Sequence, residues 1–220
     1  MSVYWLTSDL IFPDVNDAEP DGLLAVGGDL SLSRLKLAYQ NGIFPWYNEN
    51  PVLWFSPNPR MVLFLDDLKI HRSLRKILSK NEFIVTFNKA FKDVIKACAS
   101  SHAHKGTWIN PQMIEAYIAL HQAGMAVSVE CWQKNQLVGG LYGVCINNVF
   151  CGESMFHLVD NASKVALVHL VRKLASLGFT LLDSQVYTEN MARFGAKYIS
   201  RNQYLAILRK ERVIPAYEFS

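Results

Sequence analysis

AVSVECWQKNQLVGGLYGVCINNVFCGESMF, residues 126–156, contains three apolar runs separated by two short polar connections. The runs are rich in valine and aromatic residues, and the connections QKNQ and INN fit hairpin turns. Strands joined by hairpins lie antiparallel and next to one another. The stretch therefore predicts a three-stranded antiparallel meander.

Helical patterns lie on both sides of the predicted meander. Upstream, a helix begins at Asn110 and its apolar stripe stops at Gly124. Downstream, we expect a helix between residues 161 and 178, then a strand at 179–186 (FTLLDSQV) and a closing helix near 204–208. This order of elements predicts an α+β fold, in which a mixed sheet carries helices on its faces.

The N-terminal part has a different character. A helix is predicted at 32–40 with Ser31 as its N-cap. The proline-rich stretch at 45–59 then separates this part from the rest of the chain. We therefore expect a small N-terminal domain at 1–62, of a size that is marginally stable alone, and a larger domain at 63–220.

Composition excludes several classes of protein. The chain has 220 residues, half of them hydrophobic, so it can bury a substantial core. It has no apolar run of membrane-spanning length and no signal-peptide pattern at its start, so a cytoplasmic location with no membrane partner is expected. Its four cysteines are widely spaced, which argues against disulfides and structural zinc; they are Cys98, Cys131, Cys145 and Cys151.

Charge is distributed unevenly along the chain. Residues 1–68 contain three basic and nine acidic residues, whereas residues 69–105 contain nine basic and two acidic ones. The basic segment starts with KIHRSLRKILSK at 69–80. Clustered lysine and arginine favour binding of a polyanion, but a solvated helix face has the same composition, and the sequence leaves both readings open.

Glu153 ends an otherwise apolar run. A carboxylate in such a place requires a partner, because burying it unpaired is costly. That partner is either an internal cation, such as Lys164 or Arg201, or a basic group of a substrate.

Asp183 and Gln185 are two residues apart on the last predicted strand, so their side chains are expected on one face. A Gln185 amide that donates to Asp183 would leave its oxygen directed outward, ready to accept a hydrogen from an amine. Structural pairing at the end of a strand is the alternative. Of the aromatic residues near the prolines, Phe44 is expected to pack internally, whereas Trp46 and Trp54 either pack or face a ligand.

These segments together resemble the leucyl/phenylalanyl-tRNA-protein transferase family over nearly the whole chain. Any one of the matching stretches is weak on its own, but their order and spacing make the resemblance specific. The stretches are GLLAVGGDLSLSRLKLAYQNGIFPWY, WFSPNPRMVL, GTWI, AYIALHQAGMAVSVECW, LVGGLYGV, FCGESMF, NASKVAL, DSQVYT and FGA.

The resemblance implies a fold and a reaction. The larger domain is expected to be of the acetyltransferase-superfamily type. The implied reaction moves Leu, Phe or, less readily, Met from its tRNA to proteins with N-terminal Arg or Lys, which marks them for degradation. An aminoacyl ester is already activated, so no metal or cofactor is expected. The expected partners are Leu-tRNA or Phe-tRNA and the acceptor protein, and a monomer is expected.

The resemblance also assigns roles to residues. Asp183 and Gln185 match the family's catalytic pair, and Glu153 matches the acid that meets the basic acceptor. The proton acceptor stays open between Gln185 and the tRNA's own hydroxyl. The other implied sites are the tRNA's terminal adenosine at Trp46 and Trp108, the donor's side chain at Leu141, Phe150 and Leu167, and tRNA phosphates at Arg72, Arg75, Lys76 and Lys80.

Three positions depart from the family pattern. Ser184 replaces a usual cysteine, Asn190 a usual histidine, and Arg193-Phe194 a usual Ser-Leu pair. The first change is conservative, and no role is assigned to Asn190.

Two other functions compete with this one. A coenzyme A dependent N-acetyltransferase shares the expected fold, but its pyrophosphate loop requires small residues, and the connection FHLVDNASK at 156–164 has no glycine. A non-catalytic RNA-binding protein would explain the basic segment but would leave Glu153, Asp183 and Gln185 without a role.

Overall fold

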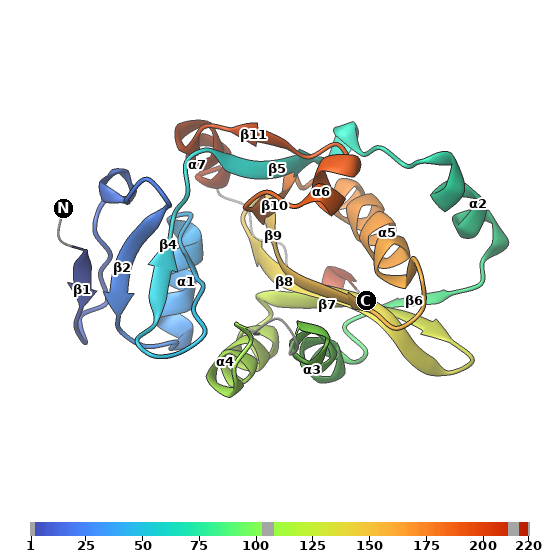
Figure 1. The fold of residues 1–220 in the computed structure, drawn as a ribbon, viewed down its shortest axis with the longest axis horizontal. Helices are drawn as coiled ribbons and strands as arrows, with labels where there is room; N and C mark the ends of the chain where they lie inside the picture. The colour runs from blue at the N-terminus through green and yellow to red at the C-terminus, as the bar shows by residue number, and fades with distance from the viewer. Residues whose placement is uncertain (1–2, 103–107, 211–215, 220) are drawn as a thin grey trace.

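The computed structural model describes residues 3–102, 108–210 and 216–219. These residues form two sheets with helices around them (Figure 1). The smaller sheet has four strands in the order β1-β2-β4-β3 and is packed beside helix α1, Leu32–Gln40. Its strands are β1 Tyr4–Leu6, β2 Leu23–Gly27, β3 Phe44–Pro45 and β4 Leu53–Phe55.

The larger sheet has seven strands in the order β11-β5-β10-β9-β8-β7-β6. The pair β10 and β9 is parallel and the other neighbours are antiparallel, so the sheet is mixed. The strands are β5 Arg60–Phe64, β6 Ile84–Phe87, β7 Ala126–Gln133, β8 Gln136–Ile146, β9 Val149–His157, β10 Leu181–Gln185 and β11 Lys197–Ile199.

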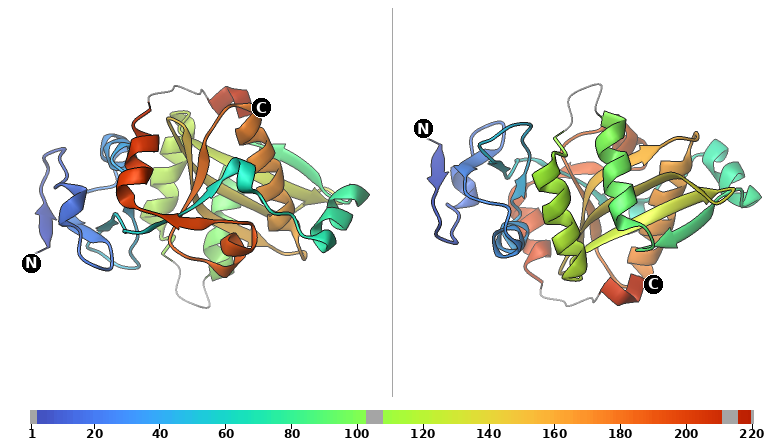
Figure 2. Two further views of the ribbon diagram at one scale, coloured as in Figure 1. Left: turned by 90° about the horizontal axis from the view of Figure 1, so that it is seen from above. Right: turned by 90° about the horizontal axis from the view of Figure 1, so that it is seen from below.

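Helices cover both faces of the seven-stranded sheet. Helices α3 and α4 lie on one face, and α5 lies on the other (Figures 1 and 2). Two apolar cores result, one on each face, and the first of them also includes α1 and the small sheet. The α-helices after α1 are α2 Arg72–Lys80, α3 Phe91–His102, α4 Pro111–Gln122, α5 Ala162–Ser176, α6 Glu189–Arg193 and α7 Arg201–Leu208, and the 3-10 turns are η1 Val15–Asp17, η2 Leu65–Asp67 and η4 Ala216–Phe219.

The predicted meander is confirmed as β7, β8 and β9, and the α+β class with a mixed sheet is confirmed with it. The first hairpin turn has positive φ at both Lys134 and Asn135, the conformation that a two-residue turn of type I′ requires. The predicted caps are also present, since Ser31 accepts from the backbone of Arg34 and Asn110 from that of Met113.

The strands β5 and β11 were not predicted, and they bear on the domain boundary. β5 and β11 pair with each other and extend the large sheet beyond β10. The boundary expected after residue 62 falls inside β5, whose five residues all pair in that sheet. The division into two domains stays a prediction, and we propose that its boundary lies before Arg60.

Trp54 and Phe44 are both buried, and the Trp54 indole nitrogen donates to the carbonyl oxygen of Gly27 at 2.9 Å. Phe44 packs internally, as expected. Within the described residues, no helix is both long and apolar enough to cross a membrane. The four cysteines carry free thiols, and Cys98, Cys131 and Cys151 are buried.

Candidate active site

A cavity of about 540 Å³ lies between the small sheet and the middle of the large one. Its walls come from distant parts of the chain, since Trp46 follows β3, Trp108 precedes α4, and Glu153 and Gln185 lie on β9 and β10. Among the lining residues that the structure describes, Glu153 carries the only acidic or basic group. The cavity therefore combines a mostly apolar wall with one carboxylate.

β-bulges occur where Glu153 and Gln185 line this cavity. On β9, Gly152 and Ser154 pair with consecutive residues of β8, so Glu153 is an extra residue without a partner on that strand. On β10, Ser184 is extra in the same way, and Gln185 adopts a left-handed φ of 63°. Bulges break the alternation of side chains and often occur beside active sites, where they redirect one residue.

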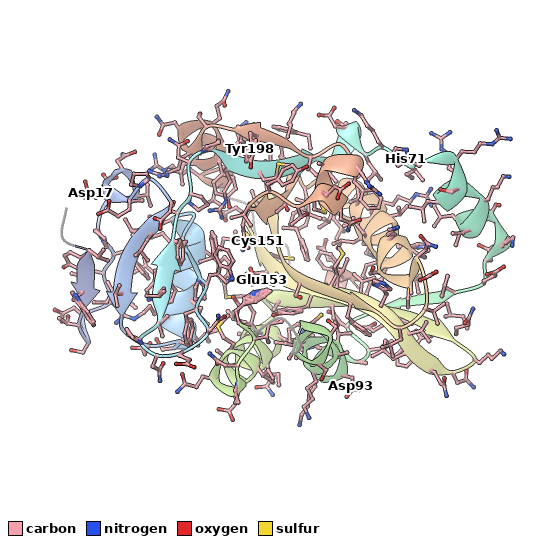
Figure 3. The ribbon with its side chains drawn as sticks, in the orientation of Figure 1. Asp17, His71, Asp93, Cys151, Glu153 and Tyr198 are labelled. Atoms are coloured by element: carbon pink, nitrogen blue, oxygen red, sulfur yellow. The ribbon has the colours of Figure 1, made fainter. Side chains whose placement is uncertain are left out.

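Glu153 is held by hydroxyl and amide groups. The Tyr39 hydroxyl donates to Oε1 at 2.7 Å, and the Tyr117 hydroxyl donates to Oε2 at 3.0 Å. The two hydroxyls also contact each other. The side-chain amide of Gln185 donates to Oε1 at 3.0 Å. Figure 3 shows Glu153 near the middle of the molecule, facing the space between the two sheets.

Of the two alternatives for the partner of Glu153, the internal cation is not found, because neither Lys164 nor Arg201 bonds to it. Lys164 donates instead to Asn161 at 3.2 Å, and the Arg201 guanidinium contacts the carbonyl oxygen of Val15. No lysine or arginine of the described chain forms an ion pair with Glu153. Neither cation is among the residues that line the cavity. The carboxylate is thus left with neutral donors.

This environment changes the ionisation of Glu153. Desolvation is the largest cause and raises the pKa of Glu153 to about 7 from its ordinary value of 4.5, against the three hydrogen bonds, which lower it. Burial together with the Glu153 charge also raises the pKa values of the Tyr39 and Tyr117 hydroxyls well above 10, so both remain donors. Because the pKa of Glu153 lies near neutral pH, a cation that enters the cavity would stabilise the ionised form of its carboxylate.

The raised pKa predicts how Glu153 affects stability. Between pH 4.5 and 7 the unfolded chain loses a proton that folded Glu153 keeps, so the wild-type protein loses stability over that window, by about 1 to 3 kcal/mol. Glu153→Gln removes this penalty. Its Tm, measured by calorimetry, is expected to exceed that of wild type by about 5 °C at pH 8 and to match it below pH 4.5.

Glu115→Gln, at an exposed position on α4, serves as the control. Its Tm should follow wild type throughout. A Glu153→Gln protein less stable than wild type at pH 8 would show that the ionised carboxylate is favourable where it lies.

The hydrogen bond considered between the side chains of Asp183 and Gln185 is not formed. It is the backbone N–H of Gln185 that donates to Asp183 Oδ1, at 2.8 Å, while the Gln185 side chain turns to Glu153. The bulge between the two residues removes the shared face on which the prediction relied. Asp183 is fully buried and is not part of the cavity lining. The Arg60 guanidinium donates to both of its carboxylate oxygens, at 2.9 and 2.7 Å.

Part of the cavity lining is apolar. Leu141, Phe150 and Leu167, which come from β8, β9 and α5, contribute to it and are almost fully buried. Phe150 and Met155 pack against the same core although they are five positions apart, because the bulge at Glu153 reverses the alternation of side chains. The structure therefore brings the three predicted pocket residues to one place.

Two tryptophans also line the cavity. Trp46 is 43% exposed and its ring meets Phe55 edge-on, with centroids 5.6 Å apart. Trp108 lines the same cavity and is partly buried. An exposed indole at the mouth of a cavity can stack on a planar ligand.

The four predicted phosphate-binding residues lie away from this cavity. All are exposed on α2, at the end of the molecule opposite the small sheet (Figure 1). The Arg75 guanidinium donates to the carbonyl oxygen of Ile70 at 2.9 Å, and Lys80 is 3.3 Å from Glu82. His71, just before the helix, contacts the carbonyl oxygen of Arg193 at 3.1 Å, which ties α2 to α6.

Sequence reasoning missed four polar side chains behind the site: Tyr39, Tyr117, Arg60 and Tyr204. The tyrosines lie in apolar helix stripes and are typical of core residues by pattern. Arg60 had one detectable signal, because a basic residue stood next to the apolar run MVLFL. The described residues contain no group of three side chains suited to a metal ion.

Comparison with known proteins gives matches over most of the chain. A family described as leucyl/phenylalanyl-tRNA protein transferase matches residues 62–209, and the N-terminal domain of the same family matches residues 28–58. Proteins named leucyl/phenylalanyl-tRNA–protein transferase are similar throughout. The one from Syntrophobacter fumaroxidans is 56% identical over 211 residues, with 94% of this chain and 90% of that protein covered. The one from Flavobacterium johnsoniae is 51% identical over 212 residues, with 95% and 100% covered.

Solved structures match more distantly. A protein of unknown function from Bacteroides thetaiotaomicron has a TM-score of 0.47 at 10% identity, with 79% of this chain and 59% of that chain covered. A GCN5-related N-acetyltransferase from Kribbella flavida has a TM-score of 0.39 at 10% identity, with 74% and 58% covered.

Proposed function

The chain belongs to the leucyl/phenylalanyl-tRNA protein transferase family, and we propose from this premise that it transfers Leu, Phe or, less readily, Met to proteins with N-terminal Arg or Lys. It is an aminoacyltransferase whose substrates are an aminoacyl-tRNA and a protein. The proposal includes a cytoplasmic, monomeric enzyme that marks its acceptors for degradation. The larger domain is proposed to be of the acetyltransferase-superfamily type.

One observation carries the acceptor proposal: Glu153 is a carboxylate in an apolar cavity with neutral donors around it and no cation from the described chain. A basic side chain that enters would gain a charge-assisted bond in a poorly solvated place. An uncharged side chain would leave Glu153 as it is. The contrast favours acceptors that begin with Arg or Lys.

The apolar part of the cavity lining supports the proposal that the donor amino acid is Leu, Phe or Met. Leu141, Phe150 and Leu167 would surround the side chain of the esterified amino acid, and Trp46 and Trp108 would hold the terminal adenosine. Such a pocket rejects polar side chains but separates similar apolar ones by about 1 to 3 kcal/mol per methylene. A short list of large apolar donors is consistent with that limit.

The reaction then requires positioning more than activation. The neutral acceptor amine attacks the ester carbonyl carbon and forms a C–N bond. The C–O bond to the ribose then breaks, and the amine's proton ends on the released ribose oxygen, which becomes a hydroxyl. The Gln185 side-chain nitrogen donates a hydrogen bond to Glu153, and the side-chain oxygen can accept a hydrogen bond from the amine. We propose that Gln185 orients the amine and that Asp183 acts through Gln185.

The direct test is transfer of radiolabelled leucine from Leu-tRNA to a peptide beginning with Arg, compared with the same peptide beginning with Ala. Label is expected in the Arg peptide and at background level in the Ala peptide. Equal labelling of both would refute the acceptor assignment. Absence of label in both, with tight acetyl-CoA binding by calorimetry, would favour an N-acetyltransferase.

We further propose that Arg72, Arg75, Lys76 and Lys80 bind tRNA phosphates. Replacing all four by alanine is expected to weaken Leu-tRNA binding by about 10- to 100-fold at low salt, because each lost phosphate contact removes counterion release. The slope of log affinity against log salt should flatten by about 3 to 4 units. Lys36→Ala, at an exposed position on α1, is the control and should leave the slope unchanged. An unchanged slope in the fourfold variant would remove α2 from the tRNA site.

A further inference from the structure

Arg60, the first residue of β5, is 1% exposed and donates three hydrogen bonds. Its Nε and Nη2 atoms donate to the two oxygens of Asp183, at 2.9 and 2.7 Å. Its Nη1 atom donates to the carbonyl oxygen of Gly42, at 3.1 Å, in the turn that follows α1. One guanidinium therefore bridges β10 and the N-terminal part of the chain.

Two aromatic rings lie against this guanidinium. The Arg60 Cζ atom is 4.8 Å from the ring centre of Phe44, which lies on β3, and 4.6 Å from that of Tyr204, which lies on α7. The Tyr204 hydroxyl also donates to Asp183 Oδ2 at 2.9 Å. Stacking and bidentate bonding both depend on a planar, forked group, so a lysine cannot replace these contacts.

Asp183 links Arg60 to Gln185, which lines the cavity. Its Oδ1 accepts the backbone N–H of Gln185, the residue that the bulge places at a φ of 63°. A left-handed conformation is uncommon for glutamine and persists when its surroundings determine it. The Gln185 side chain then bonds Glu153. A continuous set of contacts thus runs from Gly42 and Phe44 through Arg60 to the two polar groups of the cavity.

We propose that Arg60 is a positioning residue of the transfer reaction: it fixes Asp183, and through Asp183 the bulge at Gln185, so that Gln185 is aligned only when the Gly42–Phe44 turn is docked against β5. This inference rests on the proposed function. It gives Asp183 a role without contact with substrate, which agrees with its burial outside the cavity lining. It also makes the N-terminal part of the chain a component of the active site.

A purely structural role is the competing explanation, and the chain offers a matched control. Arg201 is a second buried arginine, 7% exposed, whose guanidinium contacts the Val15 carbonyl oxygen rather than Asp183. Arg60→Lys and Arg201→Lys each replace the N–H donors of a buried guanidinium by the fewer donors of an ammonium group. A structural role predicts loss of Tm in both variants and similar turnover in both.

The proposal predicts a different result. Arg60→Lys should lower kcat by about 10- to 100-fold. KM values for Leu-tRNA and for the Arg peptide should stay within about threefold of wild type. Arg201→Lys should lower Tm by a similar amount but keep kcat within about threefold of wild type. Equal kcat in the two variants would overturn the inference.

A variant that fails to fold would not end the test. Tyr204→Phe removes one hydroxyl from Asp183 with little change in volume, and it should lower kcat by about 3- to 10-fold with unchanged KM. If Arg60→Lys does not fold, an unchanged kcat in Tyr204→Phe overturns the inference. Wild-type protein that transfers no leucine would refute the proposed function itself, which is a separate outcome.

Discussion

Glu153→Gln is expected to reduce transfer of leucine to an Arg-initiated peptide by about 100- to 1,000-fold. Glutamine keeps the size of the side chain but removes the charge that a guanidinium or ammonium group would meet in the cavity. A basic group that enters would then be poorly solvated and unpaired, a loss of about 3 to 4 kcal/mol. Each 1.4 kcal/mol corresponds to a factor of ten.

The measurement is kcat/KM for peptides that differ in their first residue. In wild type, the Arg peptide should exceed the Ala peptide by a large factor, and in Glu153→Gln that ratio should approach one. Affinity for Leu-tRNA should change little, because the donor is proposed to contact other residues of the cavity lining, namely Leu141, Phe150 and Leu167. Glu115→Gln controls for loss of a surface charge. A variant that retained the preference for Arg would show that another group selects the acceptor.

The periodic parts of this fold were predictable from the sequence, and the reason is local. Strands β7 to β9 combine apolar runs with two-residue turns, so hydrophobicity and turn residues indicate the same structure. The helices with clear caps, such as α1 and α4, followed for the same reason. β5 and β11 were missed because one follows a proline-rich stretch and the other has three residues.

The positions of the candidate site residues could be named, but their geometry could not. Strict alternation places Asp183 and Gln185 on one face, and the bulge at Ser184 cancels that rule. No pattern in the sequence signals this bulge, because it depends on pairing with β5, more than 100 residues earlier. The tyrosines that hold Glu153 come from α1 and α4. Their contacts arise only when distant segments pack together.

Gln185→Ala is expected to lower kcat by about 100- to 1,000-fold while KM for Leu-tRNA stays within about threefold. The substitution removes the amide oxygen that is proposed to accept a hydrogen bond from the amine, and it also frees Glu153 Oε1 from one donor. The effect should be confined to turnover, because the apolar wall and the two tryptophans remain. Single-turnover transfer with saturating peptide separates this loss from weaker binding.

Controls must separate the side chain of Gln185 from its unusual backbone. Gln185→Gly accepts a φ of 63° without strain, so its Tm should equal or exceed that of Gln185→Ala while its kcat stays equally low. Ser184→Ala, at the neighbouring bulge residue, should retain most of the wild-type rate. Recovery of turnover in Gln185→Gly would show that backbone shape at the bulge, and not the amide group, limits the reaction. In that case the constraint applied by Arg60 through Asp183 would account for the rate on its own.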